Sequence, residues 1–309
     1  MLPQGQARDP SVSAFRFPAF RFHSAMTVLE AIKKTSEFFE NKGVDSPRLQ
    51  AELLLAHVLK MPRMKLYLNF DRVLAPAEVD AFRETVRRRG QREPLQHIVG
   101  TVSFCGLELA TSRHALIPRP ETELLAQFGW EFLQQHSAAA PTAFDFGTGT
   151  GCLPISLAVK CPQIRVWAGD ISSEALALAR DNAAKHAVQD RIEFIESDGF
   201  AGLAVDTRFD LIVSNPPYIA TAEIATLQPE VRDHDPRLAL DGGADGLDFY
   251  RRLAEQGRAR LNPGGKIMVE LGDGQAAAVT EIFSAQNWIV EAIRQDYSPR
   301  DRFLLAKCP

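Results

Sequence analysis

Short apolar runs alternate with helical patterns from residue 141 to the end of the chain. The runs are rich in β-branched and aromatic residues, and the segments between them repeat apolar residues at helical spacing. Parallel strands need a long crossover between them, usually a helix, so this alternation predicts a mostly parallel α/β sheet. The expected strands are Ala143–Phe146, Arg165–Ala168, Ile192–Ile195, Phe209–Val213, Lys266–Glu270, Trp288–Ala292 and Phe303–Ala306, and the expected helices include Ser173–Lys185, Leu247–Leu261 and Gly274–Ala285.

The chain is longer than one compact core usually requires. Its 309 residues suggest two domains. From Thr27 to about Gln91 every signal is helical, and glycine and proline mark the expected helix ends. We expect Ser46 as an N-cap with Pro47 as first helical residue, further starts at Pro62 and Pro76, and ends at Gly43 and Gly90.

The order of these patterns predicts four parts. Residues 1–25, with three arginines and one acidic residue, are expected to lie outside the fold as a disordered or mis-started extension, because Met26 precedes the first helix. Residues 26–94 form a helical bundle. Residues 95–118 form a β-hairpin linker, since Ile98-Val99 and Val102–Leu109 carry β-formers around glycines. Residues 119–309 form the α/β domain.

Composition excludes several classes of protein. The net charge is −4, and no apolar run approaches the roughly 20 residues that span a bilayer, so we expect neither a direct nucleic-acid partner nor a membrane. The four cysteines and seven histidines show no metal-ligand spacing, which predicts no metal site and a cytoplasmic location. The one dense basic patch, Arg87-Arg88-Arg89 with Arg92, is either a solvated helix end or a docking surface.

A glycine-rich loop follows the first expected strand. It reads Asp145-Phe146-Gly147-Thr148-Gly149-Thr150-Gly151 and opens a helix. Its three glycines allow the backbone to turn tightly and to approach a ligand that a Cβ atom would block. Dinucleotide loops usually read G-x-G-x-x-G, whereas this loop reads G-x-G-x-G. Asp145 can bind an amino group, so the loop suits the amino-acid end of S-adenosylmethionine better than a pyrophosphate.

Two carboxylates follow the next two strands. Asp170 ends the second strand, where it can accept both ribose hydroxyls of a nucleoside, and it would serve NAD equally well. Asp198 follows the third strand and is placed to accept from the adenine amino group. We expect Gly199 and Phe200 to lie beside the adenine ring.

The fourth strand ends in Asn215-Pro216-Pro217-Tyr218, at the sheet edge where α/β proteins place their ligands. Two prolines stiffen this backbone and remove two donors, which leaves carbonyl oxygens free to accept. Asn215 adds a further carbonyl oxygen, and Tyr218 adds a flat face. The tetrapeptide is therefore predicted to hold a planar NH2 group, from an amide or from adenine.

This arrangement suggests how a poor nucleophile is methylated. The lone pair of an amide nitrogen is delocalised, but the Asn215 side chain and the Pro216 carbonyl can hold both NH2 protons and direct the lone pair at the donor methyl group. They also stabilise the positive charge that develops on the nitrogen. No general base is needed before transfer, and we nominate none.

Together these motifs resemble the HemK/PrmC-type family, the protein-(glutamine-N5) methyltransferases that act on peptide-chain release factors. The resemblance spans essentially residues 26–307. Besides the two motifs above, it is carried by Arg92-Glu93-Pro94-Leu95-Gln96, Leu116-Ile117-Pro118-Arg119-Pro120-Glu121-Thr122-Glu123, Pro236-Arg237-Leu238-Ala239-Leu240-Asp241-Gly242-Gly243, Asp245-Gly246-Leu247 and Arg300-Asp301-Arg302.

The resemblance implies a Rossmann-like class I S-adenosylmethionine methyltransferase with a seven-stranded, mostly parallel sheet. It implies that the substrate is the glutamine of the Gly-Gly-Gln motif in class 1 release factors, that the helical domain helps dock the factor, and that the protein is a monomer. The donor-binding residues would be Gly147, Thr148, Gly149, Thr150, Gly151, Asp170 and Asn215, and Asn215, Pro216, Pro217 and Tyr218 would receive the glutamine.

Two departures inside the fold and three alternatives remain at this point. Pro154 lies in the first helical turn after the glycine loop, where proline is tolerated. Position 199 is glycine where relatives often carry an aromatic residue. The alternatives are a ribosomal-protein glutamine methyltransferase, a nucleic-acid adenine amino-methyltransferase, and a cofactor-binding protein without enzymatic activity.

Overall fold

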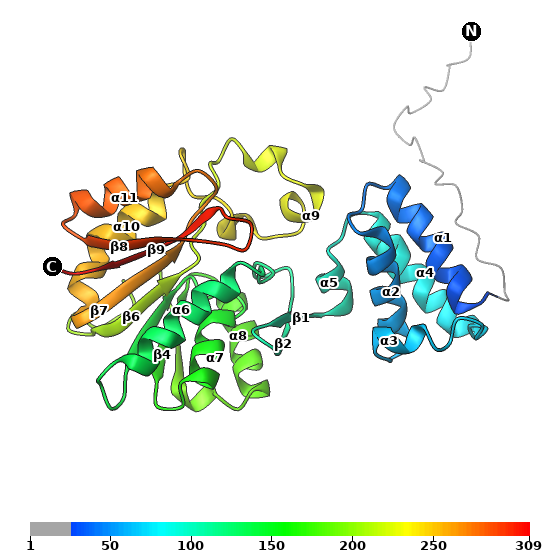
Figure 1. Cartoon of the computed structure of the whole chain (residues 1–309), viewed down its shortest axis with the longest axis horizontal. Coiled ribbons are helices and arrows are strands. Elements are labelled where there is room, and N and C mark those ends of the chain that lie inside the picture. The colour runs from blue at the N-terminus through cyan, green and yellow to red at the C-terminus, as the bar shows by residue number, and fades with distance from the viewer. Residues whose placement is uncertain (1–25) are drawn as a thin grey trace, which may run out of the picture. The chain divides into compact units, whose positions relative to one another are not determined.

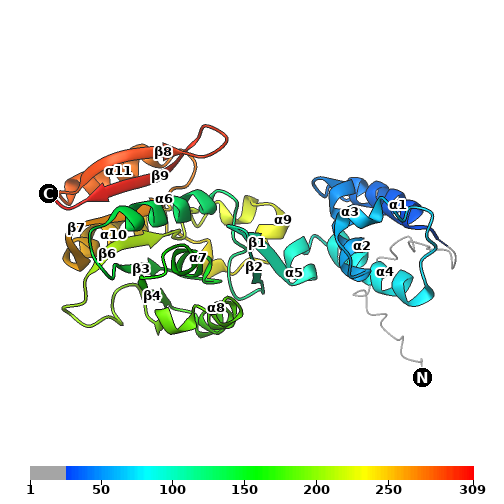
Figure 2. The ribbon, with the colours of Figure 1, turned by 60° about the horizontal axis from the view of Figure 1, so that its bottom comes forward.

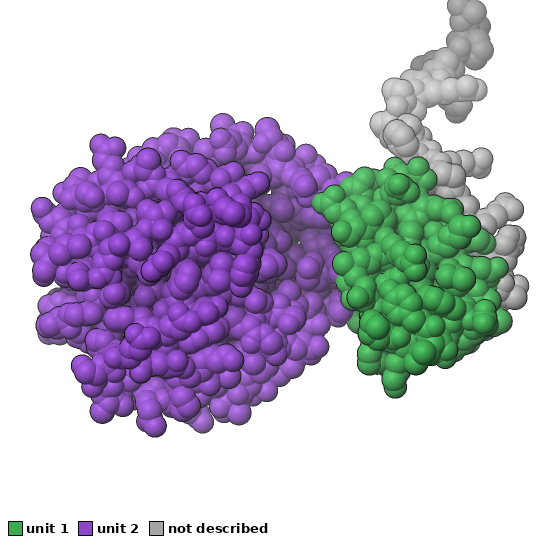
Figure 3. Space-filling view, in the orientation of Figure 1, with its two compact units in different colours: residues 1–90 green, residues 91–309 purple. Residues whose placement is uncertain are grey.

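The computed structural model describes residues 26–309 and divides into two compact units. One unit ends at Gly90, and the other runs from Gln91 to Pro309 (Figure 3). This division falls a few residues before the domain boundary that we predict at residue 94. The extension that we expect at residues 1–25 lies outside the described residues.

The described part of the first unit, residues 26–90, contains four helices: α1 (Val28–Asn41), α2 (Pro47–Val58), α3 (Arg63–Leu66) and α4 (Pro76–Gly90) (Figure 1). A capping box starts α1, because the Thr27 hydroxyl accepts from the Glu30 amide at 3.3 Å and the Glu30 carboxylate accepts from the Thr27 amide at 2.9 Å. The buried face of α1 repeats at helical spacing and contains Val28, Ala31, Ile32, Thr35 and Phe39.

Two predicted helix starts differ in detail from the structure. Ser46 precedes α2, and Pro47 is its first residue, but the Ser46 backbone is left-handed, with a φ of 48°, and its side chain caps no amide. Side-chain capping normally requires an extended backbone at this position. Pro62 precedes α3 rather than forming its first residue.

Two arginines of the predicted basic patch, Arg89 and Arg92, have side-chain partners within their own units. Arg89 is buried, and its Nε donates to Gln50 Oε1 at 2.5 Å. In the second unit, Arg92 forms a forked ion pair with Glu230: its Nε and Nη2 each donate to one carboxylate oxygen at 2.6 Å. A docking surface that used Arg89 or Arg92 would have to break these contacts.

The linker segment contains a short helix and a hairpin. Helix α5 (Leu95–Val99) precedes strands β1 (Thr101–Phe104) and β2 (Leu107–Ala110). The predicted extended conformation of Ile98-Val99 is therefore wrong. A helical turn starts after Pro94 and stops at Gly100, whose φ is 84°, so local start and stop signals outweigh the β preference of these two residues.

The second unit is built on a seven-stranded sheet with the order β5-β4-β3-β6-β7-β9-β8. Strand β9 pairs antiparallel with both β7 and β8, and the other pairs are parallel. The predicted fold class is confirmed. The strands are β3 (Thr142–Phe146), β4 (Arg165–Asp170), β5 (Ile192–Glu196), β6 (Phe209–Ser214), β7 (Leu261–Glu270), β8 (Ile289–Gln295) and β9 (Asp301–Lys307).

Helices cover both faces of this sheet (Figures 1 and 2). One core lies under α6 (Thr122–Gln135), α7 (Cys152–Lys160) and α8 (Ser173–Lys185), and the other under α10 (Asp248–Gly257) and α11 (Ala276–Ala285). Neighbouring strand residues alternate between the cores: Ala143 belongs to the first and Phe144 to the second. Helix α7 contains Pro154 in its first turn, as expected.

The connection into β7 differs from the predicted long helix over Leu247–Leu261. Helix α10 ends at Gly257, a 3-10 turn follows at Arg258–Arg260, and Leu261 already belongs to β7. Strand β7 is consequently longer than predicted, with a register irregularity opposite Phe209 and Leu211. The remaining short elements are α9 (Pro229–Arg232) and 3-10 turns at Gln189–Arg191, Ile224–Thr226 and Arg237–Ala239.

In the described part of the chain, no helix is both long and apolar enough to cross a membrane.

Candidate active site

A cavity lies where β3, β4, β5 and β6 reach their carboxyl ends, the usual ligand edge of such a sheet. The loops after these strands form most of its wall, and two further segments contribute His114, Ala115, Leu116, Pro118, Pro236, Leu238 and Ala239. Gly151, Pro216 and Tyr218 are not part of this wall. The predicted site residues that line the cavity are Gly147, Thr148, Gly149, Thr150, Asp170, Asp198, Gly199, Asn215 and Pro217.

The glycine loop joins β3 to α7 with left-handed backbone at alternate residues. Gly149 has a φ of 54°, and its amide donates to Asp170 Oδ2 at 2.8 Å. Gly151 has a φ of 79°, and a Cβ atom there would lie 3.0 Å from the Ala179 Cβ on α8. Gly149 thus forms cavity wall, while Gly151 permits close packing behind it.

Asp170 connects the glycine loop to the end of β4. Besides the bond from Gly149, its Oδ1 accepts from the Ser172 amide at 2.9 Å. A carboxylate has about four acceptor positions, so two backbone bonds leave capacity for ligand hydroxyls. The side chain stabilises the loop and lies in the cavity wall, and its contact with a ribose stays a prediction.

The environment of Asp145 differs from the one expected for a carboxylate that binds the amino group of a ligand. Its side chain is fully buried, and neither carboxylate oxygen has a hydrogen-bond partner within residues 26–309. Burial raises the pKa of Asp145 to about 7; the nearby Thr148 hydroxyl opposes this rise, and the charge of Asp170 adds to it. Asp145 is not part of the cavity wall, so the structure does not bring it to the place predicted for the amino group of the donor.

The predicted neighbour of the adenine ring is corrected by the structure. Phe200 is buried and packs on Phe144 and Phe146, with ring centroids 5.2 and 5.4 Å away. The aromatic side chains in the cavity wall are Phe146 and Phe249. Phe249 is the second residue of α10 and lies far from the glycine loop in the sequence. No local sequence pattern predicted its place in the cavity wall.

Asp198 lies at the same end of the cavity. Its carboxylate pairs with Arg252 Nη2 at 2.7 Å, and the Arg252 guanidinium lies 5.9 Å from the centre of the Phe146 ring and 5.6 Å from that of Phe249. These contacts order the wall on which a planar base would lie.

Substitution of Gly199 by alanine should weaken donor binding and lower the melting temperature. Gly199 has a φ of 65°, and a Cβ atom there would lie 2.7 Å from Phe146 Cε2. Gly264→Ala is the matched control, because Gly264 has a φ of 79° with nothing within 4 Å of its Cβ position. We expect calorimetry to show a melting temperature several degrees lower for Gly199→Ala than for Gly264→Ala. Equal melting temperatures and donor affinities would exclude the Phe146 clash.

The tetrapeptide after β6 begins with Asn215, a residue of the cavity wall whose side-chain acceptor has no partner among the described residues. Asn215 Nδ2 donates to Thr122 Oγ1 at 3.1 Å, whereas Asn215 Oδ1 is buried and has no partner among the described residues. A buried carbonyl oxygen without a donor costs about 1–3 kcal/mol, and a ligand N–H can supply that donor. Asn215 thus has a donor side that is bound to Thr122 and an acceptor side that has no partner among the described residues.

Pro216 and Tyr218 of the tetrapeptide are fixed by packing and by a hydrogen bond from Gln275. Pro216 is buried, and Tyr218 is partly buried against the second core. Burial raises the pKa of Tyr218 to about 12, so its hydroxyl stays neutral. The Tyr218 carbonyl accepts from Gln275 Nε2 at 2.9 Å, so the last main-chain acceptor of the motif is engaged.

Residues 240–246 brace this turn, which explains a glycine-rich motif whose role the sequence left open. The Gly242 amide donates to the Ile219 carbonyl at 2.8 Å, and the Ile219 amide donates to the Leu240 carbonyl at 3.0 Å. A Cβ atom on Gly242 would lie 2.8 Å from the Pro217 carbonyl oxygen. Only glycine allows the two segments to approach this closely.

These residues fit S-adenosylmethionine. The cavity offers a backbone cradle without Cβ atoms at Gly149, a carboxylate at Asp170, aromatic faces at Phe146 and Phe249, and an open acceptor at Asn215. No three His, Cys, Asp or Glu side chains in residues 26–309 are grouped as metal ligands.

Comparisons with known proteins identify both parts of the chain. Residues 30–100 match the PrmC N-terminal domain family, and residues 124–233 match the methyltransferase small domain family. The catalytic domain of hMettl16, solved with an RNA hairpin, has a TM-score of 0.52 at 17% identity over 66% of this chain and 78% of its own, which shows the shared fold.

Curated relatives cover nearly the whole chain. The release factor glutamine methyltransferase of Geobacter sulfurreducens is 45% identical over 89% of this chain and 95% of its own length. That of Chlorobaculum tepidum is 44% identical over 90% and 96%, respectively. The family resemblance carried by the motifs is therefore confirmed: the chain belongs to the release factor glutamine methyltransferase family, whose methyl donor is S-adenosylmethionine.

Proposed function

We propose that this protein transfers a methyl group from S-adenosylmethionine to the side-chain amide nitrogen of the glutamine in the Gly-Gly-Gln motif of class 1 peptide chain release factors. The observation that carries the proposal is the buried, unpartnered Asn215 Oδ1 beside the glycine-loop cavity. The names of the relatives supply the protein substrate. Methylation of this glutamine would modulate translation termination.

Donor binding falls to residues at the ends of β3, β4 and β5. Gly147 to Gly151 would accommodate the amino-acid end, Asp170 would accept from the ribose hydroxyls, and Asp198 with Gly199 would lie at the adenine. When bound, S-adenosylmethionine supplies a methyl group on a positively charged sulfur. The phenyl rings of Phe146 and Phe249 would exclude water from its base.

Asn215 and Pro216 would orient the glutamine amide. Asn215 Oδ1 accepts one N–H and the Pro216 carbonyl accepts the other, so that the nitrogen lone pair is directed at the methyl carbon. The N–C bond forms as the S–C bond breaks, and the electron pair of that bond stays on sulfur. The two acceptors stabilise the charge on nitrogen, which then loses a proton to water. Pro217 and Tyr218 would support the plane of the amide.

The helical unit would help to dock the release factor, and we infer that the protein acts as a monomer in the cytoplasm, without direct contact to nucleic acid. Translation takes place in that compartment, and the relatives of the same length carry the same function in their names. Docking through exposed apolar side chains of this unit, such as Met64 and Leu68, is compatible with the engaged arginines.

Labelling with several acceptors tests the substrate. Purified protein is incubated with methyl-labelled donor and, in separate reactions, a class 1 release factor, a ribosomal-protein mixture, DNA or RNA. We expect label in the release factor alone and its loss when Gly-Gly-Gln is changed to Gly-Gly-Ala. Label that persists in the Gly-Gly-Ala factor would contradict the proposal, and strong label in ribosomal protein or nucleic acid would favour the corresponding alternative.

A further inference from the structure

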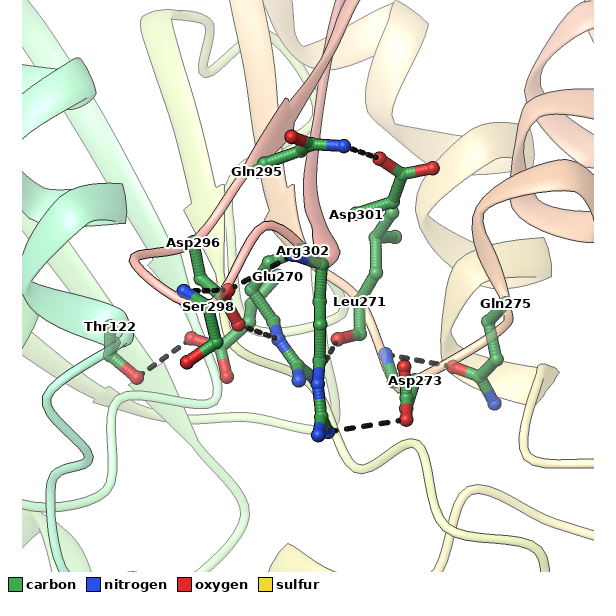
Figure 4. Close-up of polar contacts among 12 residues, drawn as sticks. Thr122, Glu270, Leu271, Asp273, Gln275, Gln295, Asp296, Ser298, Asp301 and Arg302 are labelled. Carbon is green, nitrogen blue, oxygen red and sulfur yellow. Dashed lines mark hydrogen bonds and ion pairs between the residues drawn. The ribbon is translucent and has the colours of Figure 1, made fainter.

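A buried carboxylate lies directly behind the tetrapeptide. Glu270 ends β7, its side chain is 2% exposed, and its Oε2 accepts the Thr122 hydroxyl at 2.7 Å (Figure 4). Thr122 is the first residue of α6 and is itself 2% exposed. Two segments nearly half the chain apart thus meet at one hydrogen bond, although neither residue has a role in the proposed methyl transfer.

The hydrogen bond between Thr122 and Glu270 is linked to Asn215 in the proposed transfer site. Thr122 Oγ1 also accepts from Asn215 Nδ2 at 3.1 Å. The three side chains form a linear series in which Asn215 donates to Thr122 and Thr122 donates to Glu270. Both Thr122 and Asn215 line the cavity, whereas Glu270 is not part of its wall.

We propose that Glu270 and Thr122 are positioning residues that hold the Asn215 amide in the one orientation in which Oδ1 faces the acceptor nitrogen. The inference rests on the proposed function and adds to it the origin of the geometry at Asn215. The two ends of an asparagine amide have nearly the same shape, so packing alone selects poorly between them. A rotated amide would present two N–H donors to the substrate NH2 group and repel it.

An ionised Glu270 carboxylate fixes which group donates and which accepts in the series of Asn215, Thr122 and Glu270. A carboxylate can only accept, so the Thr122 proton must point at Glu270 and the Thr122 oxygen is left to accept from Asn215 Nδ2. A protonated Glu270 could instead donate to Thr122, and the Thr122 proton could then point at Asn215 Oδ1. The protonation state of Glu270 therefore decides whether both amide orientations are compatible with the site.

The charges around Glu270 set where it ionises. Burial, the largest influence, raises the pKa of Glu270 to about 7; the Thr122 bond, Arg302 and Arg119 oppose this rise, and the charge of Glu121 adds to it. Tyr250 from α10 donates to the Glu270 carbonyl, and Tyr218 lies close enough to Glu270 for its own pKa to be raised by it.

Arg302 has a fixed position beside this carboxylate. Its Nη1 donates to the Leu271 carbonyl at 2.8 Å and its Nε pairs with Asp296 at 3.4 Å (Figure 4). These contacts hold Arg302 in place, and its positive charge lowers the pKa of Glu270, which favours the ionised form.

Thr122→Val tests the series with little change in volume. We expect kcat on the release factor to fall about ten- to a hundredfold, because the Asn215 amide loses its anchor. The KM for the factor and the donor dissociation constant should stay within about twofold, and Thr122→Ser, which restores the hydroxyl, should recover most of kcat. Thr35→Val is the matched control, because Thr35 is also a buried helical threonine, in α1, and should leave kcat unchanged.

Glu270→Gln tests the direction of the series through the pH profile. Wild-type kcat should rise as pH increases through about 7, as Glu270 loses its proton. A glutamine amide can donate or accept, so the variant should have a lower kcat without this rise. Donor titration and thermal melting establish that each variant is folded.

Several results would overturn the inference. A kcat of Thr122→Val within twofold of wild type, a Thr122→Ser variant as slow as Thr122→Val, or the same pH profile in Glu270→Gln would each contradict it. A loss of donor affinity equal to the loss of kcat would make Thr122 a donor-binding residue instead. Failure of the proposed function would give a different result, because wild-type protein would then leave the glutamine unlabelled. The positioning role of Thr122 and Glu270 would then be wrong as well.

Discussion

Asn215→Ala should lower kcat about 10²–10³-fold while the donor dissociation constant stays within about threefold. The substitution removes Oδ1, which the structure leaves buried and without a partner among the described residues. It also removes the donor to Thr122, whose hydroxyl keeps its bond to Glu270. The loss should therefore appear in the transfer step and not in donor binding.

Single-turnover labelling of the release factor measures that step, and isothermal titration with S-adenosylmethionine measures binding. If donor affinity disappears together with transfer, Asn215 is chiefly a cofactor residue, and its assignment to the orientation of the substrate amide is wrong.

Asp170→Ala should have the opposite signature, with the donor dissociation constant raised about ten- to a hundredfold. Hydrogen bonds to charged groups are worth about 1.5–3 kcal/mol, and this carboxylate would serve the ribose besides the amides of Gly149 and Ser172. Loss of those two backbone contacts should also loosen the glycine loop. When the donor is raised to saturation, the rate of methyl transfer should recover substantially, because the acceptor at Asn215 is intact.

Asp181→Ala on α8 is the matched control for this substitution, since Asp181 is exposed and lies on the helix that follows Asp170 in the chain. We expect its donor affinity to equal that of wild type. An Asp170→Ala variant that also binds the donor as wild type does would remove Asp170 from the ribose.

The sequence predicted features that depend on local pattern. All seven strands of the sheet lie within about five residues of their predicted bounds. The inner strand β6 is the clearest case, because it is buried on both faces and stands out as a continuous apolar run. The glycine loop and Asn215 were found for a related reason: each follows a strand directly, so its place at the ligand edge is set by the strand itself.

Features that depend on contacts between distant segments could not be predicted in this way. Phe249 lies in the cavity wall and Phe200 does not, although Phe200 is closer to Asp198 in the sequence. Side-chain direction after a strand depends on the turn that follows, and that turn buries Phe200. The bond between Thr122 and Glu270 joins α6 to β7 and has no local signature at either end.

The most direct test of the proposed function is identification of the methylated atom. Wild-type protein, release factor and a donor with a deuterated methyl group are incubated, and the Gly-Gly-Gln peptide is analysed by tandem mass spectrometry. We predict one deuterated methyl group on the glutamine side chain, which acid hydrolysis releases as methylamine. Label on another residue, release as methanol from an ester, or an unmodified glutamine would contradict the proposed transfer to the glutamine amide.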